Sequence, residues 1–141
     1  MHRHHPMSAA EPSALRRRRL FYALATLGII ACGLIWRRPE LGLPLLAAKY
    51  GGSMLWGAMV FFTVATLLPS AKLFRVAIIA ATVAAGVEFS QLIQIEWLDK
   101  FRTTTIGALL LGRTFTWWDI AAYWAGIALA CTGTIGLQRK R

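Results

Sequence analysis

The sequence predicts an all-α integral membrane protein, a bundle of about four transmembrane helices with a short interfacial or re-entrant segment before the last helix. Two observations lead to this fold class. The chain of 141 residues is 57% hydrophobic and only 16% charged, whereas about a quarter of the residues in a soluble domain are charged. The charged residues also cluster in short blocks between apolar runs that are long enough to cross a bilayer.

Four apolar runs account for the expected transmembrane helices. The first, residues 20–36, has about 17 residues and is just long enough to cross the hydrocarbon core. The remaining three are residues 54–68, which Pro69 closes, residues 73–95 and residues 117–136. Residues 20–138 are therefore expected to form a single four-helix membrane domain.

The two ends of the chain are basic. Residues 1–19 contain two prolines and no apolar stripe, so we expect them to form a mobile cytoplasmic arm, and residues 139–141 to form a basic cytoplasmic tail. Four consecutive arginines at residues 16–19 could bind nucleic acid. Because they directly precede the apolar run at Leu20, we interpret them as membrane-flanking charge and expect no nucleic-acid partner.

Two apolar stretches are too short to cross the membrane. Residues 41–50 are interrupted by Gly42 and Pro44, so we expect them to lie along the interface, followed by a turn at residues 51–53. The long connection before the last helix contains residues 106–111, which are expected to form the interfacial or re-entrant segment. The threonines just before it, Thr103, Thr104 and Thr105, supply a helix cap.

The distribution of Lys and Arg predicts the orientation, because cytoplasmic loops carry the excess of these residues. With the amino terminus inside, ten fall on the cytoplasmic side and six on the outer side. Both termini are therefore expected to be cytoplasmic. The inner set is Arg3, Arg16, Arg17, Arg18, Arg19, Lys72, Arg75, Arg139, Lys140 and Arg141, and the outer set is Arg37, Arg38, Lys49, Lys100, Arg102 and Arg113.

A set of polar residues lies in or beside the last two spans. Glu88 is a carboxylate inside the third span, and Gln91 shares its helical face. Asp119 and Tyr123 lie at the start of the fourth span, and Arg102 lies in the connection between the two. A charged group inside a membrane is costly unless it is paired or faces water, so we expect these five to converge beneath the outer interface.

Several functions are compatible with such a cluster. The first is a pocket for an anionic lipid or a lipid-linked cell-wall intermediate, with Arg102 and Arg113 meeting the phosphate. The second is an intramembrane enzyme that uses Glu88 and Asp119 as an acid–base pair. The third is a structural subunit, either a homo-oligomer or the partner of another membrane protein. In that case the polar groups only join helices, with Arg102 bound to Glu88.

No cofactor or metal is expected. Cys32 and Cys131 both fall inside predicted spans, and His2, His4 and His5 have no cysteine or carboxylate cluster beside them. The tryptophans near the outer boundary predict an aromatic belt at the lipid–water interface rather than a binding platform. These are Trp36, Trp97, Trp117 and Trp118.

The same residues carry a resemblance. The run from Tyr50 to Trp56 is followed by Glu88-Phe89-Ser90-Gln91-Leu92, Arg102-Thr103-Thr104 and Phe115-Thr116-Trp117-Trp118-Asp119-Ile120. This order resembles an uncharacterised family of small bacterial multi-pass membrane proteins, a domain of unknown function. The resemblance implies a place in the bacterial cytoplasmic (inner) membrane.

A looser similarity covers residues 88–126. The order Glu88, Gln91, Arg102, Asp119, Gly126 is similar to that of the VanZ-like family, whose founding member is associated with resistance to a glycopeptide antibiotic. This similarity implies a role in the cell envelope. The VanZ-like pattern has an Asn shortly after its Asp, where this chain has Tyr123.

Overall fold

A computed structural model describes residues 10–112 and 114–141, and within them every element is a helix. The predicted all-α class is confirmed. The predicted mobile arm falls partly on residues 1–9, which lie outside the described residues, as do the three histidines. In chain order the helices are α1 (Ala10–Trp36), the 3-10 turn η1 (Pro39–Leu41), α2 (Leu45–Leu67), α3 (Leu73–Ser90), α4 (Glu96–Thr103), α5 (Thr105–Leu111) and α6 (Trp117–Arg139).

Four of these helices, α1, α2, α3 and α6, are long and apolar enough to cross a membrane. At 1.5 Å per residue, α2 and α6 are each about 34 Å long, which exceeds the ~30 Å hydrocarbon core of a bilayer. The chain is a multi-pass membrane protein.

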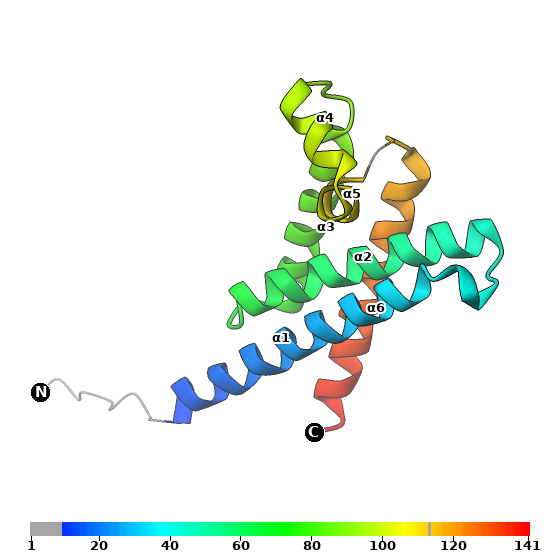
Figure 1. Ribbon diagram of the computed structural model, residues 1–141. Coiled ribbons are helices and arrows are strands. Elements are labelled where there is room, and N and C mark those ends of the chain that lie inside the picture. Colours follow the sequence, from blue (N-terminus) through cyan, green and yellow to red (C-terminus); the bar gives the residue numbers. More distant parts are fainter. Residues whose placement is uncertain (1–9, 113) are drawn as a thin grey trace, which may run out of the picture.

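The long helices form two antiparallel pairs (Figure 1). The α1–α2 pair crosses the α3–α6 pair, and the short helices α4 and α5 cover the upper end of α3 in that view. We call this end, where α1 and α3 end and α2 and α6 begin, the loop end. The opposite end, where α1 begins and α6 ends, is the terminal end.

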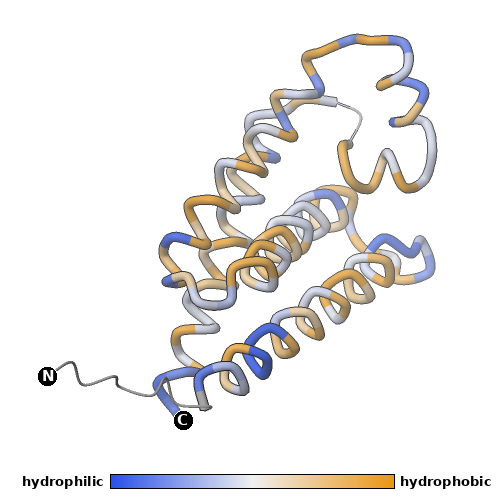
Figure 2. Tube along the Cα trace, turned by 90° about the vertical axis from the view of Figure 1, so that its left-hand side faces the viewer, coloured by the Kyte–Doolittle hydropathy of each residue, from blue (hydrophilic) through white to orange (hydrophobic). Residues whose placement is uncertain are grey.

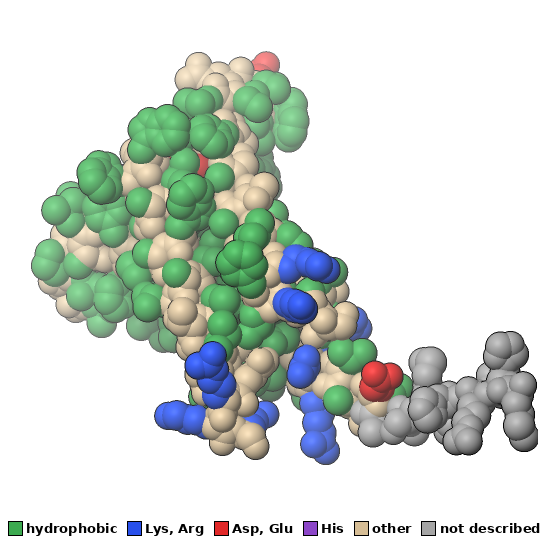
Figure 3. All heavy atoms as spheres, turned by 180° about the vertical axis from the view of Figure 1, so that it is seen from behind, with side chains coloured by type: hydrophobic (Ala, Val, Ile, Leu, Met, Phe, Trp, Pro, Cys, Tyr) green, Lys and Arg blue, Asp and Glu red, His purple; other side chains and the backbone are tan. Residues whose placement is uncertain are grey.

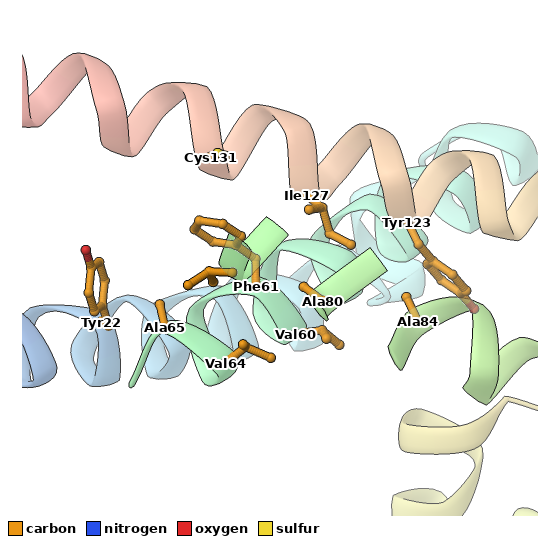
Figure 4. Packing of buried hydrophobic residues seen from close by; sticks show 11 residues of the cluster. Tyr22, Val60, Phe61, Val64, Ala65, Ala80, Ala84, Tyr123, Ile127 and Cys131 are labelled. Atoms are coloured by element: carbon orange, nitrogen blue, oxygen red, sulfur yellow. The ribbon is translucent and has the colours of Figure 1, made fainter. Parts of the chain in front are cut away.

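The core lies where the two pairs cross. Phe61 from α2 and Ala80 from α3 are completely buried there, and Ile127 from α6 closes the cluster (Figure 4). The buried face of α3 repeats every four residues, at Val76, Ala80, Ala84 and Glu88. Because two of these residues are alanines, α2 and α6 can approach α3 closely.

The outer surface is apolar, as expected for a protein surrounded by lipid. Leu45, Leu67 and Phe74 are among the large hydrophobic side chains that are mostly exposed. Hydrophobic residues follow the long helices while hydrophilic residues gather near their ends (Figure 2). Seen from behind, Lys and Arg side chains lie over the terminal end, below a largely hydrophobic face (Figure 3).

Helix α1 differs from the prediction at its start. It begins at Ala10 rather than Leu20, so the basic run at residues 16–19 is helical and not part of an irregular arm. Arginine is a good helix former, and Pro12 lies in the first turn, where a missing N–H costs no helical hydrogen bond. The four arginines are therefore held on a rigid helix that continues into the membrane span.

Helix α2 corrects two further predictions. Residues 41–50 are not a separate interfacial segment and residues 51–53 are not a turn, because α2 begins at Leu45 and runs through both. Gly51 and Gly52 instead allow close packing. A Cβ at Gly51 would lie 2.5 Å from Trp36 Nε1, and one at Gly52 would lie 3.3 Å from Arg37 Nε.

The segment between α3 and α6 agrees with the prediction only in part. Helix α3 ends at Ser90 rather than at residue 95, and the sequence did not predict α4. The short helix expected at residues 106–111 is present as α5, and Thr104 caps it by accepting a hydrogen bond from Gly107 N at 3.0 Å. At the other end of the molecule, α6 extends three residues beyond the predicted limit, to Arg139.

Candidate ligand-binding site at the loop end

Glu88 lies at the centre of a hydrogen-bond network near the end of α3, and its side chain is completely buried. One carboxylate oxygen, Oε1, accepts from Thr116 N at 2.9 Å. The other, Oε2, accepts from Gln91 Nε2 and from the Tyr123 hydroxyl, both at 3.0 Å. We call Glu88, Gln91, Thr116 and Tyr123 the carboxylate network. It joins the end of α3 to the start of α6.

Asp119 adjoins this network through the cap of α6. Thr116 is the N-cap residue, and its hydroxyl accepts from Asp119 N while donating to Asp119 Oδ2. In a capping box, the third helical residue usually bonds the backbone N–H of the cap. Here Glu88 takes that N–H. The second Asp119 oxygen, Oδ1, is consequently available to accept from Ser53 Oγ on α2, at 3.2 Å.

Arg102 is buried, with only 5% of its surface exposed, but it does not join the other candidates. Its guanidinium donates to the carbonyl oxygens of Ser90 and Ile93 and to Asp99 Oδ1. The expected bond between Arg102 and Glu88 is therefore wrong. Because α3 ends at Ser90, its last carbonyl oxygens need donors, and the planar guanidinium supplies them.

A cavity of about 360 Å³ opens beside the carboxylate network. We call it the loop-end cavity. Its polar lining comes from the end of α1, the first turns of α2, the end of α3 and the start of α6, so the fold brings together residues far apart in sequence. The lining residues that carry polar side chains are Arg37, Lys49, Ser53, Gln91, Thr114, Asp119 and Tyr123.

Two cations line this cavity, and both side chains are exposed rather than buried. Arg37 follows α1 and lies across α2 at Gly52, which has no side chain to displace it. Lys49 lies in the second turn of α2, one turn before Ser53, whose hydroxyl also donates to the Lys49 carbonyl oxygen at 3.1 Å. The only acidic residue in the lining described here is Asp119.

Gln91 lines the cavity and also takes part in the carboxylate network. Its Nε2 donates to Glu88 and to the Leu111 carbonyl oxygen at 2.8 Å, which fixes the orientation of the amide. Its Oε1 is buried without a hydrogen-bond partner in the described part of the chain, and the residue is only 8% exposed. Gly112 permits this packing, because a Cβ there would lie 2.6 Å from Gln91 Nε2.

A second, apolar cavity of about 100 Å³ adjoins this site, and Arg37 lines both. It lies between α1, α2 and α5. Its lining is almost entirely hydrophobic and includes Ile30, Leu55, Met59 and Leu109.

Sequence reasoning identified part of this site. It predicted that Glu88, Gln91, Asp119 and Tyr123 would come together, and the hydrogen bonds join them through Thr116. It missed five residues of the site. Thr116 could have been found as a hydroxyl residue beside a helix start, and Arg37 as the first cation after a span. Ser53 lies within α2 and gave no such signal. Lys49 and Thr114 carried no signal of their own, and Arg113 lies outside the described residues.

No metal site is evident in the described ranges, where no three His, Cys, Asp or Glu side chains group closely enough to hold an ion. The chemistry of the loop-end cavity is that of two cations, two carboxylate or amide acceptors and several hydroxyl groups. Such a site can bind an anion and accept hydrogen bonds from its substituents.

A comparison with known protein families shows which family the chain belongs to. Residues 43–127, more than half of the chain, match the model of a family described as a protein of unknown function, DUF2809. The chain belongs to the DUF2809 family. The predicted membership of an uncharacterised family is thereby confirmed, while the looser VanZ-like similarity stays a prediction. No solved structure matches this chain.

The DUF2809 region contains nearly all of the site. It extends from just before α2 to the middle of α6, so it includes Lys49, Ser53, the carboxylate network and Asp119. Arg37 lies outside it, at the end of α1. The cation that lines both cavities therefore comes from the residue directly after α1, before the DUF2809 region begins.

Proposed function

We propose that this DUF2809 protein binds the phosphate-bearing head group of an anionic membrane lipid, a class that includes lipid-linked cell-wall intermediates, in the loop-end cavity. The observation that carries the proposal is that Arg37 and Lys49 line one cavity, in which Asp119 is the only acidic residue of the lining described here. Cations attract a phosphate.

Two further features support a lipid rather than a soluble anion. The four tryptophans expected in the aromatic belt all lie at the loop end, in or beside the ends of α1, α4 and α6, and three of them are mostly exposed. Tryptophans of this kind mark the level of lipid head groups. The apolar cavity on the other side of Arg37 offers space for part of an acyl or prenyl chain.

The same geometry gives less support to an acid–base enzyme. Both oxygens of Glu88 accept hydrogen bonds within the protein, and Glu88 does not line the loop-end cavity. A general acid or base must reach the proton that it transfers. Asp119 does line the cavity, but both of its oxygens accept hydrogen bonds from Ser53 and Thr116, so binding is the better-supported function.

The test compares neighbouring arginines. Arg37→Gln removes a cation that lines the cavity, whereas Arg38→Gln removes the next residue, which is exposed and does not line it. Binding of phosphatidylglycerol and of a polyprenyl phosphate to the purified protein is measured by native mass spectrometry. We expect Arg37→Gln to weaken binding about tenfold, since a charge-assisted hydrogen bond is lost, and Arg38→Gln to weaken it less than about twofold.

Two results would contradict the proposal. Equal losses in the two variants would mean that the basic loop attracts lipids without a defined site. Unchanged lipid binding in the double variant Arg37→Gln with Lys49→Gln would show that the lipid does not bind in the loop-end cavity. Thermal midpoints measured in detergent show whether each variant is still folded.

We further propose that the loop end faces the outside of a bacterial inner membrane and that both termini are cytoplasmic. The excess of Lys and Arg at the terminal end supports this orientation. Single cysteines are placed at Glu40 and at Lys140 in a variant without Cys32 and Cys131, and intact spheroplasts are treated with an impermeant thiol reagent. We expect labelling at position 40 alone, and labelling at position 140 alone would reverse the orientation.

A further inference from the structure

A separate cavity of about 610 Å³ lies at the terminal end, between the start of α1 and the end of α6. We call it the terminal-end cavity. A hydrogen bond from Gln138 Nε2 to the Tyr22 hydroxyl, at 3.3 Å, joins the two helices at this place. The cavity is lined by Ala14, Arg17, Arg18, Phe21, Tyr22, Thr134, Leu137, Gln138 and Arg141.

The lining is strongly cationic. Arg17 and Arg18 come from the early turns of α1, and Arg141 follows α6, so guanidinium groups reach the cavity from both helices. No acidic side chain lines it, and no hydrogen bond or ion pair joins these three guanidinium groups to another described residue. The acidic residue at this end, Glu11, lies in the first turn of α1, outside the lining.

Tyr22 provides a fixed polar group within the same cavity. Only 3% of its surface is exposed, and its ring lies 6.4 Å from that of Phe62, measured between centroids. Figure 4 shows it projecting from α1 toward α6. Because its hydroxyl oxygen accepts from Gln138, the hydroxyl hydrogen remains available to donate to a ligand.

The cavity is bordered by apolar surface that continues into the membrane span. Phe21 and Leu137 line it and are substantially exposed. Leu24 on α1 is exposed too, and because it lies seven residues after Arg17 it extends the apolar surface on the same helical face. A ligand with an anionic head and acyl chains would contact arginine at one end and these side chains along its length.

We infer that the terminal-end cavity binds the phosphodiester head group of an anionic phospholipid, with Arg17, Arg18 and Arg141 around the phosphate and the Tyr22 hydroxyl donating to it. Basic pockets between transmembrane helices are suited to such head groups. The planar guanidinium also presents paired donors that match phosphate oxygens. The apolar border favours a lipid over a free anion.

This site is independent of the function proposed above. It lies at the opposite end of the bundle, and all of its lining residues fall outside residues 43–127. It is therefore a feature of the flanking parts of α1 and α6 rather than of the DUF2809 region. Loss of binding at one end should leave binding at the other end unchanged.

The test uses the same basic run as its own control. Arg17→Gln with Arg18→Gln removes two cations that line the cavity, whereas Arg16→Gln with Arg19→Gln removes two neighbouring cations that do not. Native mass spectrometry of the full chain measures binding of phosphatidylglycerol and of phosphatidylcholine, in a background that carries Arg37→Gln. We expect the lining pair to weaken phosphatidylglycerol binding about tenfold or more, and the control pair less than about threefold.

A second variant examines the buried hydroxyl. Tyr22→Phe keeps the ring packing and should weaken phosphatidylglycerol binding about threefold, the effect of one hydrogen bond. Equal weakening by the lining and control pairs would overturn the site, since only diffuse charge would then be involved. So would equal binding of phosphatidylcholine, or displacement of the lipid by inorganic phosphate at constant ionic strength.

Discussion

The carboxylate network and the loop-end cavity lie side by side, but they differ in how far their polar side chains are buried and hydrogen-bonded within the protein. In the network, both oxygens of Glu88 accept hydrogen bonds from protein donors, and the side chain is completely buried. In the cavity, Asp119 lies in the lining with two exposed cations, Arg37 and Lys49. Gln91 belongs to both, because its amide nitrogen donates to Glu88 in the network and the residue also lines the cavity.

The difference shows that a carboxylate inside a membrane span need not be a functional group. Glu88 attracts attention in the sequence because an unpaired charge at that position would be costly. Its three hydrogen-bond donors offset part of that cost, and this geometry favours a role in holding α3 against α6. The polar groups available to a ligand are those outside the network, and they lie at the loop end of the helix bundle rather than at its centre.

The largest expected effect comes from breaking the network. Glu88→Ala leaves the donors of Thr116, Gln91 and Tyr123 without their acceptor in a buried place. We expect a loss of about 2 to 4 kcal/mol in the free energy of unfolding, because each buried unsatisfied group costs roughly 1 kcal/mol or more and unfolded helices in a membrane recover part of this. Unfolding in mixed micelles of dodecyl sulfate measures it.

Glu40→Ala is the matched control, since Glu40 is an exposed carboxylate in η1 at the same end of the molecule. It should change the free energy of unfolding by less than about 0.5 kcal/mol. If the two variants were equally stable, the network would contribute nothing and Glu88 would again be a candidate for chemistry.

The second effect concerns the contact that holds the cavity wall together. A Cβ at Gly126 on α6 would lie 2.0 Å from the Met54 carbonyl oxygen on α2, next to Ser53. Gly126→Ala should therefore separate α2 from α6 and cost about 2 kcal/mol or more, as overpacking does. On the same helix, Gly133 has nothing within 4 Å of such a Cβ, so Gly133→Ala should be neutral or slightly stabilising.

The same unfolding measurement also reports on ligand binding if it is repeated with phosphatidylglycerol. Gly126→Ala should lose most of the stabilisation that this lipid gives, because Ser53 and Asp119 no longer face each other. Equal stability of the two alanine variants would show that α2 and α6 can adjust without cost.

The membrane-spanning segments could be predicted from the sequence, but the packing of the helices against one another could not. Four long apolar runs identify the transmembrane helices because hydropathy depends on composition alone. The glycines at residues 51–52 indicate a turn by local rules, whereas α2 uses them to accommodate Trp36 and Arg37. Whether these glycines form a turn or continue a helix depends on contacts at the end of another helix, and a local sequence pattern does not reveal such contacts.

The site was predictable where a residue was anomalous by itself. Glu88 and Asp119 are charged residues in apolar spans, and both belong to the polar cluster. Arg102 looked like their partner because it is a cation nearby in sequence. Its true partners are carbonyl oxygens, exposed by an α3 that ends at Ser90, and the end of a helix is the feature that sequence predicts least well.

The third effect is that of replacing Arg102, and it distinguishes a structural role at the end of α3 from a role in the loop-end cavity. Arg102→Lys retains the charge but loses the fork that reaches Ser90, Ile93 and Asp99 together. We expect a loss of about 1 to 2 kcal/mol in the free energy of unfolding, and unchanged phosphatidylglycerol binding. In combination with Glu88→Ala, the two losses should add within about 0.5 kcal/mol, as for residues that share no partner.

Lys100→Ala is the control here, because Lys100 forms an exposed ion pair with Glu96 on the same short helix. Its effect should not exceed about 0.5 kcal/mol. A strong loss of lipid binding in Arg102→Lys at normal stability would return Arg102 to the ligand site and make the carbonyl contacts incidental.

The smallest effect on stability, and the finest test of the cavity, is Asp119→Asn. Asparagine keeps an acceptor for Ser53 and a group of the same shape beside Thr116, so the free energy of unfolding should change by less than about 1 kcal/mol. Its effect on binding depends on what the carboxylate does. If Asp119 accepts a hydrogen bond from a head-group hydroxyl, phosphatidylglycerol should bind several-fold more weakly, since a charged acceptor is roughly twice as strong as a neutral one. Phosphatidic acid has no such hydroxyl and should bind at least as well as before, because the negative charge next to its phosphate is gone. Parallel weakening of both lipids would mean that Asp119 shapes the cavity without touching the ligand, and the division between a structural network and a binding cavity would then lie at Arg37 and Lys49 alone.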